Sequence, residues 1–500
     1  MSLQVTWLNN AIKKLQIATV LPNQGVLSII KAITLDEMTL MFTPGTAYSP
    51  SSSSHAATAA FTLPFAFPID ITGLEQNITT GYKGTDFAQL QMPMSPVTTD
   101  VQNRVIHLTF SNVPFGVFSG REGVFQQFLA ATTTSESETF HLSGSANAIA
   151  NTAVGTITLT GVAFSVDTTI AGLQGLNAKP AVVSNLDVNH GYPGYLLIKV
   201  TTTLYNPSNL TIGTGDVSFD LQFASQTIGS AAIDGMTIVP GTANYSTDVH
   251  YSPQSDAATA AGRTMLQSFL QGIMSSTKIQ GSQGTTAVDS LKLAMSEIAL
   301  QADIPALHQQ LITGTTIVFP PNIAQTGVAQ ATTDLNNPFT ASLNILALTA
   351  HAYYHGLNIG NIDRFDASSQ PIHAGGHSAT TTPTLPLKFN LDPLVIIQML
   401  STASQEAGVD LGPLKQMFQL VVQNPADHPN ITATVANGDS GCHSGAQFDV
   451  NGAILKSLAG LKVDLVVDTT LKLDDCKLAR PNLLDKDIGS FNYRPNRPFL

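Results

Sequence analysis

The stretch TTTLYNPSNLTI at residues 201–212 recurs as TTDLNNPFTASL at residues 332–343, and this recurrence organises the chain. Both copies contain Thr-x-Leu-x-Asn-Pro, and Asn206 lies 131 residues before Asn337 (337 − 206). Self-similarity at one fixed shift is the signature of stacked, similar modules. The sequence therefore predicts a tandem array.

The same shift keeps turn residues and apolar positions in register from residue 202 to residue 269. A second match, at a shift of 134, lies upstream, and residues 36–47 echo residues 234–243. Because that echo enters part-way through a module, we expect the first module to lack its beginning. The shift of 131 pairs Ile228-Gly229 with Ile359-Gly360, Pro240 with Pro371, and Met265, Leu266 and Phe269 with Ile396, Ile397 and Leu400. The shift of 134 pairs Ile157, Leu159, Ile170 and Leu173 with Leu291, Leu293, Ile304 and Leu307.

Within a module the apolar period is two. In DVSFDLQF, residues 216–223, apolar side chains alternate with polar neighbours, which is typical of a strand with one buried face. Asn206-Pro207-Ser208 and Pro240-Gly241 are turn sequences, because proline fixes φ and glycine accepts positive φ. Short strands between regular turns predict an all-β fold of tandem immunoglobulin-like sandwiches. A few short helices are expected at residues 257–274, 392–407 and 411–422.

Composition supports this fold class. Charged residues make up 11% of the 500 residues, whereas ordinary soluble proteins have about 25%. We expect a truncated unit at 1–135, further units at 136–280 and 281–428, and a C-terminal β segment at 429–500. The net charge of −12 and the absence of dense cationic clusters argue against nucleic-acid binding. No apolar run is long enough for a membrane span, and no signal peptide is visible.

The repeat run Leu-x-Asn-Pro-Ser at residues 204–208, followed by a strand, Ile-Gly and a Pro-Gly turn, resembles the late-embryogenesis-abundant type 2 (water-stress and hypersensitive-response) sandwich. With Gly144, Ala146 and Ala148 and with GLQGL at residues 172–176, it resembles more closely a fungal family of tandem domains of unknown function. That resemblance implies single-pass proteins of the fungal vacuole membrane, one of them linked to the termination of autophagy. The membrane anchor is expected in the parent protein and is absent from this chain.

Two motifs imitate catalytic or metal sites. Thr349-Ala350-His351 and Asp439-Ser440-Gly441 follow the order of chymotrypsin-like motifs, but the flanking residues differ and the repeat puts His351 opposite Asp220, in an ordinary strand. We therefore expect no enzyme activity. His351/His355 and His373/His377 are both H-x3-H pairs. On a strand the first pair lies about 13 Å apart, too far to share an ion. The second pair lies in a glycine-rich loop that has the composition of a Zn²⁺ or Cu²⁺ site. Solvated loop histidines are the simpler interpretation, so no metal and no cofactor is assigned.

The remaining candidates are a turn, a helix, a disulfide and glycosylation sites. Asn206 and Asn337 are expected to cap turns. The apolar stripe Met265, Leu266 and Phe269 is expected to close a core, with a lipid surface as the alternative. Cys442 and Cys476 are a candidate disulfide, because their two strands can return the chain to one edge; two unrelated thiols are the alternative. Candidate N-glycosylation sites are Asn77, Asn209, Asn244 and Asn430.

Together these features predict a non-catalytic, lumenal or extracytosolic scaffold or interaction region of a fungal vacuolar-membrane protein. Its location is then the lumenal side of that membrane or another secretory lumen. Its protein partner cannot be named from the sequence. The alternative is a lipid-binding or lipid-transfer module with an apolar groove along stacked sandwiches.

Overall fold

The computed structural model describes residues 29–62, 68–153, 155–412, 458, 461–473 and 491–493. The chain divides into two compact units. The four segments predicted above, with boundaries at residues 135, 280 and 428, stay predictions. Within the described ranges, no helix combines the length and the apolar character that a membrane crossing requires. Unit 1 comprises Met1–Thr39, Tyr48–Phe125 and Glu138–Ile170, and unit 2 comprises Leu40–Ala47, Gln126–Ser137 and Ala171–Leu500.

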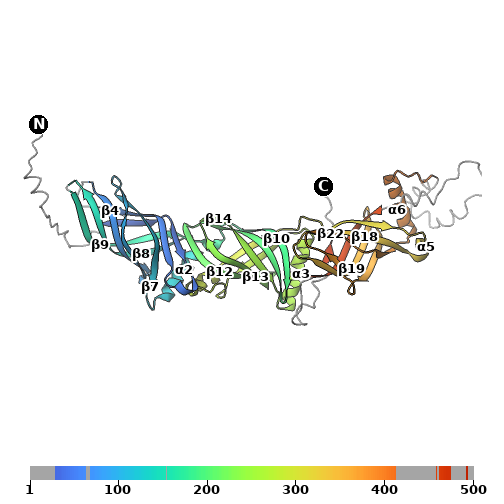
Figure 1. Ribbon diagram of the computed structural model, residues 1–500, viewed down its shortest axis with the longest axis horizontal. Helices are drawn as coiled ribbons and strands as arrows, with labels where there is room; N and C mark the ends of the chain where they lie inside the picture. Colours follow the sequence, from blue (N-terminus) through green and yellow to red (C-terminus); the bar gives the residue numbers. More distant parts are fainter. Residues whose placement is uncertain are drawn as a thin grey trace, which may run out of the picture. The chain divides into compact units, whose positions relative to one another are not determined.

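Unit 2 contains a closed β-barrel of seven strands, shown in green in Figure 1. Around the ring the order is β12-β13-β14-β11-β10-β16-β15 and back to β12. Neighbouring strands are antiparallel except β10 and β16, which pair in parallel through Ala181↔Ala302 and Val182↔Asp303. The strands are β10 (Ala181–Tyr192), β11 (Tyr195–Asn206), β12 (Leu210–Phe223), β13 (Gln226–Ile238), β14 (Gly241–Tyr251), β15 (Ser275–Gln280) and β16 (Ala299–Ile304).

The prediction of tandem immunoglobulin-like sandwiches is therefore wrong, although the fold is mostly β as expected. The period-two pattern was interpreted correctly, because Val217, Phe219 and Leu221 are all buried. A barrel and a sandwich both bury one face of each strand, so alternation cannot separate them. The parallel β10–β16 pairing decides the matter, since it joins the first and last strands of the ring.

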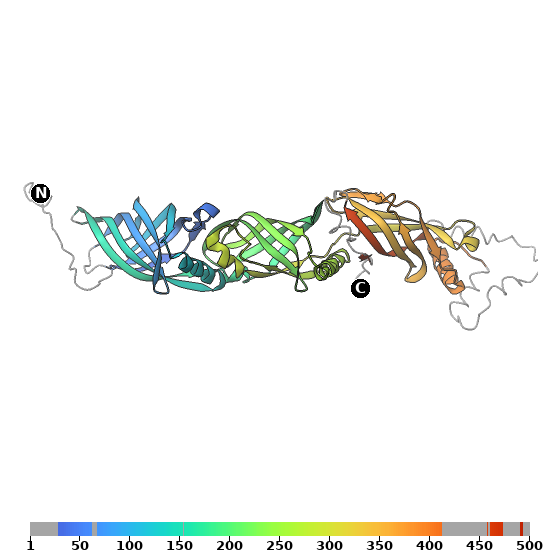
Figure 2. The same cartoon turned by 90° about the horizontal axis from the view of Figure 1, so that it is seen from below.

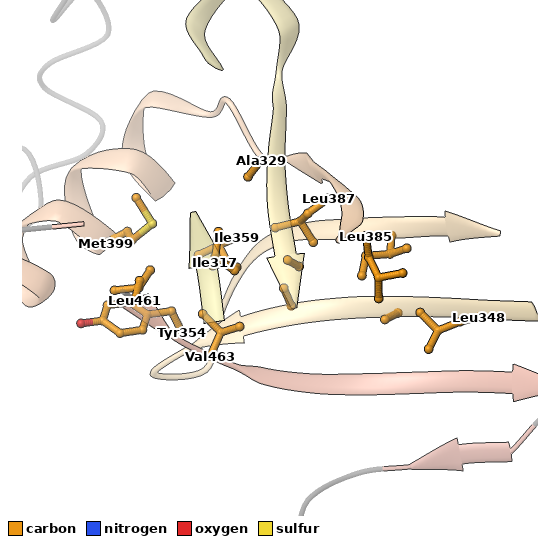
Figure 3. Packing of buried hydrophobic residues seen from close by; sticks show 14 of the residues in the cluster. Ile317, Ala329, Leu348, Tyr354, Ile359, Leu385, Leu387, Met399, Leu461 and Val463 are labelled. Atoms are coloured by element: carbon orange, nitrogen blue, oxygen red, sulfur yellow. The ribbon is translucent and has the colours of Figure 1, made fainter. Parts of the chain in front are cut away.

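The C-terminal part of unit 2 forms a second sheet, here called the C-terminal sheet, in the order β24-β17-β18-β23-β20-β19-β25-β26. Its core contains Ile317, Ile359, Leu385 and Met399, which Figure 3 shows packed between the strands and helix α6. Residues 461–473 pair with β17 at one end and with β19 along the rest. The elements are β17 (Ile312–Val318), β18 (Val328–Asn337), β19 (Leu343–Tyr354), β20 (Leu357–Asp366), β21 (Ile372–Ala374), β22 (Ser378–Thr381), β23 (Leu385–Phe389), α6 (Pro393–Glu406), β24 (Leu461–Lys462), β25 (Asp464–Leu473) and β26 (Phe491–Tyr493).

Unit 1 repeats the strand order of the barrel as β1-β3-β7-β5-β4-β8-β9. The Thr168 hydroxyl of β9 donates to the carbonyl of Ile33 in β1 at 2.9 Å, so the two ends of this row touch. Phe87, Phe115 and Phe125 form its aromatic core, with ring centroids 5.6 to 6.1 Å apart. Its strands are β1 (Ile30–Leu35), β3 (Ser51–Phe61), β4 (Asp70–Tyr82), β5 (Thr85–Pro96), β6 (Thr98–Asp100), β7 (Val105–Val117), β8 (Ser137–Thr152) and β9 (Gly155–Ala171).

Short elements complete the described chain. Two of them are longer helices. Helix α3 belongs to the barrel, and α2 contains one of the points in the sequence where unit 1 gives way to unit 2. The bounds are β2 (Met38–Met41), η1 (Pro44–Thr46), α2 (Glu122–Thr134), η2 (Gln174–Leu176), α3 (Asp256–Leu270), η3 (Asp289–Leu291), α4 (Lys292–Ser296) and α5 (Ile323–Thr326).

The two Asn-Pro loops confirm the 131-residue register. Asn206 donates to the carbonyl of Leu210 at 2.9 Å and accepts the Ser208 amide at 2.8 Å. Asn337 donates to the carbonyl of Ala341 at 2.8 Å and accepts the Phe339 amide at 3.1 Å. Both side chains bond the residues two and four positions ahead, so each holds its own turn as predicted.

Gly229 and Gly360 also occupy equivalent places, although in strands and not in the predicted turns. Each is the fourth residue of its strand, β13 or β20. A Cβ on Gly229 would lie 2.1 Å from the carbonyl oxygen of His250, and one on Gly360 would lie 2.4 Å from that of Lys388. The neighbouring backbone therefore leaves no room for a side chain at either position.

The register fails after these glycines. The residues opposite them, Tyr251 and Phe389, are 138 apart (389 − 251). The helix N-caps, Ser255 and Asp392, are 137 apart (392 − 255). Seven extra residues therefore enter between β20 and β23, and the predicted pairing of Met265 with Ile396 is wrong.

The other two sequence matches hold only in part. Ile170 and Ile304 both lie near the end of a strand, in β9 and β16. Leu159 lies in β9, however, whereas Leu293 lies in helix α4, because the barrel replaces a strand hairpin by a helical excursion. In the third match, residues 38–40 and 236–238 both lie in strands, β2 and β13, with the first and third residue of each buried. The second half of this match fails, because Pro44–Thr46 form a 3₁₀ helix whereas Gly241 begins β14.

Candidate functional site

Helix α3 was expected at residues 257–274 and forms over Asp256–Leu270. The Ser255 hydroxyl caps it by accepting the Ala258 amide at 3.1 Å. Met265 and Phe269 are 3% and 5% exposed, so the apolar stripe closes a core as predicted. Figure 2 shows the helix at one end of the green barrel.

Under α3 the barrel encloses an almost wholly apolar cavity. Tyr251 lies against Gly262 of the helix, where a Cβ would fall 2.3 Å from the tyrosine hydroxyl oxygen. Burial of this ring raises the pKa of Tyr251 to about 12. The walls of the cavity come from all seven barrel strands and α3. They are formed by Val183, Leu186, Val188, Ile198, Val200, Thr202, Leu221, Ala231, Thr247, Val249, Tyr251, Met265, Leu266, Phe269, Thr277, Ile279, Ala302 and Ile304.

The size of this cavity decides what it holds. Its volume is about 50 Å³. An engineered cavity of about 150 Å³ in another protein just accommodates benzene. The barrel interior therefore has the polarity of a lipid site but one third of the space that a small aromatic ring needs.

A packed, buried contact joins the barrel to the C-terminal sheet. The Phe339 ring, in the loop between β18 and β19, lies 6.2 Å from the Phe269 ring of α3. Both rings belong to a buried cluster with Val188, Ile198 and Ala341. The apolar stripe of α3 thus has two partners, the barrel interior and the next sheet.

Directed hydrogen bonds fix this contact. The Thr340 amide donates to the carboxylate of Asp187 at 2.8 Å. The Ala341 amide donates to the carbonyl of Val188 at 2.9 Å, and the Leu307 amide donates to that of Phe269 at 3.0 Å. Because Asn337 holds the turn from which the Thr340 and Ala341 amides project, the Asn-Pro loop serves as the connector between the two parts of unit 2. We call this contact the β10–Asn337 joint.

The four clustered histidines do not come together. His351 lies exposed in β19, the strand position that the repeat predicts. His373 pairs with Asn344 at 3.0 Å, and His377 with the Thr340 hydroxyl at 3.1 Å. Among the described residues, no group of three or more His, Cys, Asp or Glu side chains has the geometry to hold a metal.

His355 instead belongs to a cluster that the sequence did not reveal. Its Nε2 lies 2.8 Å from a Glu406 carboxylate oxygen, and the Tyr354 hydroxyl donates to the other oxygen at 2.5 Å. These bonds, that from Tyr354 first, hold the pKa of Glu406 below its usual value. Burial and the same carboxylate raise the pKa of Tyr354. An open cleft of about 390 Å³ lies between the His355-Gly356 turn and α6. His355 and Glu406 are 51 residues apart in the sequence, and no sequence motif links them.

A second cluster that the sequence missed lies in unit 1. Ser165 Oγ is 3.0 Å from Nε2 of His141, whose Nδ1 is 2.8 Å from Asp167. The atoms follow the Ser-His-Asp order of hydrolases. Asp167 is 74% exposed, however, and the three side chains stand on the outer faces of β8 and β9. Water screens an ion pair so exposed, so the geometry is that of a surface hydrogen-bond ladder.

The other predicted residues divide by location. Asn77 and Asn244 are exposed, and Asn209 is half-buried. Asn430, Asp439, Ser440, Cys442 and Cys476 lie outside the described residues, as does most of the helix predicted at 411–422. The disulfide and glycosylation assignments stay predictions.

Comparison with known proteins gives a family without a known activity. Residues 85–221 match a family described as "Protein of unknown function (DUF3712)". The match runs from β5 of unit 1 to β12 of the barrel. No curated protein matches the chain.

Solved structures with partial similarity include the Amycolatopsis orientalis exo-chitosanase CsxA, at 16% identity, covering 53% of this chain and 27% of that one, with a TM-score of 0.14. A second structure of the exo-β-D-glucosaminidase CsxA, from a study of its inhibition, matches at 15% identity, with the same coverage and TM-score. The chain thus spans about a quarter of these proteins. At such a TM-score the likeness supports no conclusion about fold or activity.

Proposed function

We propose that the chain is a non-catalytic scaffold that holds β modules in a fixed relation. The β10–Asn337 joint carries this proposal. It combines ring packing between Phe269 and Phe339 with three backbone amides that donate across or beside the contact. Two domains joined by a flexible linker need no hydrogen bonds between them, whereas a scaffold that fixes their relative position requires such contacts.

The setting is proposed to be the lumenal side of a fungal vacuolar membrane or another secretory lumen, with an anchor supplied by the parent protein. This part rests on the sequence resemblance and on the low fraction of charged residues. Protease protection of the tagged parent protein in sealed vacuoles tests it. Digestion of the tagged domain by external protease would place it on the cytosolic side.

Distance measurements test the scaffold. Spin labels at the exposed positions Thr242 and Asn358 report the separation of the barrel from the C-terminal sheet in a full chain whose two cysteines are replaced. We expect a narrow distance distribution that broadens in Phe339→Ala and in Asp187→Ala. Phe365→Ala, a truncation in the core of the C-terminal sheet, is the matched control and should leave the distribution narrow. A broad distribution in the unmodified chain would falsify the scaffold.

The apolar barrel cavity favours a second candidate, lipid binding. An acyl chain needs far more than the 50 Å³ present, so α3 would have to leave the barrel to admit it. Native mass spectrometry of chain purified from its own membrane separates the two. If the chain is a scaffold, its measured mass should equal that of the protein alone. If it is a lipid module, the mass should include one equivalent of bound lipid, and the Met265→Lys variant should lose that lipid.

A further inference from the structure

The cleft between the β19–β20 hairpin and helix α6 differs in size from the barrel cavity. Its volume is about 390 Å³, whereas the barrel encloses about 50 Å³. A cavity of roughly 150 Å³ just accommodates benzene, so the cleft has more than twice that space. It therefore has room for a ligand of the size of one sugar ring without any movement of α6.

A comparison with the barrel shows that the hairpin beside the cleft does not need its histidine. Residues 354–356 read Tyr-His-Gly, and the barrel has Phe-Ala-Ser at residues 223–225, at the shift of 131 residues (354 − 223). Both are two-residue turns, since Phe223 pairs with Gln226 as Tyr354 pairs with Leu357. The two turn residues have positive φ in each copy. The fold thus forms this turn with alanine in the place of His355.

Unit 1, which repeats the strand order of the barrel, shows that the tyrosine–glutamate bond belongs to the module. Its β4–β5 hairpin reads Tyr-Lys-Gly at residues 82–84. The Tyr82 hydroxyl donates to the carboxylate of Glu138 at 2.9 Å, as Tyr354 donates to Glu406. This bond recurs in a hairpin that has no histidine, so it is structural. The imidazole of His355 is then the feature of the turn that neither other copy explains.

The charges at the cleft compensate each other. His355 Nε2 lies 2.8 Å from one oxygen of Glu406, and the Tyr354 hydroxyl donates to the other oxygen. Among the described residues that line the cleft there is no lysine, arginine, aspartate or glutamate. A charged ligand would find no free counter-charge here, so the chemistry favours a neutral one.

The polar part of the lining consists of groups that both donate and accept hydrogen bonds. The side chains of Gln398 and Ser401 line the cleft from α6 and make no hydrogen bond within the described part of the chain. The Thr402 hydroxyl donates to the carbonyl of Gln398 and keeps its acceptor capacity. Because Nε2 of His355 is bonded to Glu406, the neutral imidazole presents Nδ1 as an acceptor.

The apolar part of the lining comes from the edge of the core. Leu357 lies on the hairpin, and Met399, which Figure 3 shows at the α6 end of the core, is 1% exposed. A concave site with an apolar wall and a few convergent polar groups is typical of small-molecule binding.

We propose that this cleft binds the pyranose ring of a neutral sugar. Sugar hydroxyl groups donate and accept at once, so they match the amide of Gln398, the hydroxyl of Ser401 and the imidazole of His355. The C–H groups of the ring pack against Met399 and Leu357. The site adds a ligand to the proposed scaffold, at the α6 end of the C-terminal sheet.

Methyl NMR of the full chain tests the binding. The Met399 methyl group reports on the cleft, and Met236, which is buried in the barrel, is the internal reference. Methyl α-glucoside, methyl α-mannoside and methyl α-galactoside are each titrated to about 100 mM, enough to saturate a site with a Kd of about 1 mM. We expect one of them to shift the Met399 resonance in a saturable manner while Met236 stays unchanged.

Variants locate the site. Gln398→Ala removes a donor and an acceptor and should raise the Kd at least about tenfold. Gln405→Ala is the matched control, because Gln405 is an exposed residue of the same helix outside the cleft, and it should leave the Kd unchanged. His355→Gly should weaken binding as much as Gln398→Ala. Glycine suits this position because the φ of His355 is 49°, and circular dichroism checks that each variant is folded.

Three results would overturn the proposal. The first is a Met399 resonance that none of the three glycosides moves. The second is a Kd in Gln398→Ala equal to that of the unmodified chain, because the sugar would then bind elsewhere. The third is a saturable shift with inorganic phosphate and with no glycoside, because that ligand is charged. The scaffold proposal stands or falls separately, on the spin-label distances.

Discussion

The barrel and the C-terminal sheet of unit 2 build the same loop and the same glycine contact but close their cores differently. Asn206 and Asn337 make equivalent hydrogen bonds, and Gly229 and Gly360 meet equivalent carbonyls. After the glycines, the C-terminal sheet has six more residues before its helix than the barrel has (137 − 131). In the barrel α3 covers an apolar cavity, whereas α6 ends at Glu406, which binds Tyr354 and His355.

This difference shows which features define the module. Hydrogen-bonded turns and close backbone contacts tolerate no insertion, so they keep their register. A helix across the end of a barrel needs only an apolar face of the right width, so its start can move. The predictions below test this distinction.

The largest expected effect concerns the helices. Phe269→Ala should destabilise the barrel by about 3–5 kcal/mol, because it removes a buried ring shared by the barrel and the joint. Hydrogen exchange should then increase in β10, β11 and the 337–343 loop together. Leu400→Ala, in α6, should increase exchange in the C-terminal sheet and leave the 337–343 loop protected. Equal exposure of the loop in both variants would remove the distinction between the helices.

The glycine contacts come next. Gly229→Ala and Gly360→Ala should each cost about 2–3 kcal/mol, since the new methyl group must displace a strand carbonyl. The two losses should agree within about 1 kcal/mol if the contacts are equivalent. Denaturation followed by exchange in β13 and β20 measures both. Gly123→Ala, in helix α2 with open space around it, should be neutral or stabilising.

The asparagines should show an effect of similar size that is unequal between the two loops. Asn206→Ala should cost about 2 kcal/mol, because two buried backbone groups lose their partners. Asn337→Ala should cost about 1 kcal/mol more, since its amide also donates to the carbonyl of Gly375 at 3.0 Å. Thermal midpoints of the two variants give the comparison. A larger loss for Asn206→Ala would contradict this difference.

The smallest effect concerns Tyr354, whose counterpart in the barrel is Phe223. Tyr354→Phe removes the strongest bond to Glu406, so the pKa of that carboxyl should rise towards its ordinary value. In the unmodified protein the pKa of folded Glu406 lies below its unfolded value. The stabilisation that these bonds give is therefore present above the unfolded pKa and is lost as the pH falls through the folded pKa. Carboxyl carbon NMR titration measures the shift. An unchanged Glu406 pKa would mean that the hydroxyl is not a significant partner.

Much of the module could be predicted from the sequence, because its signals are local. The Asn-Pro loops, the buried alternation of Val217, Phe219 and Leu221, and helices α3 and α6 all follow from neighbouring residues. The ends of the two helices were predicted to within about four residues, a usual error for boundaries inferred from sequence. The constant spacing of 131 residues is not a local signal, and it failed where extra residues enter between β20 and β23.

The rest depends on contacts between distant residues. Barrel closure requires Ala181 to meet Ala302, and no local pattern distinguishes that pairing from an open sheet edge. Glu406 and His355 meet only because α6 crosses the end of its sheet. Ser165, His141 and Asp167 line up because β8 and β9 are neighbours, and their spacing in sequence has no catalytic signature.

The parallel β10–β16 pairing also sets a timetable for biosynthesis. Ala181 and Ala302 are 121 residues apart (302 − 181), so β10 leaves the ribosome long before its partner exists. At about 5–20 residues per second, that wait lasts roughly 6–24 s. During it β11 covers one edge of β10 while the other stays open to pairing with any nascent strand nearby. A chaperone that shields this edge during translation would therefore matter more to the yield of folded protein than to its final stability.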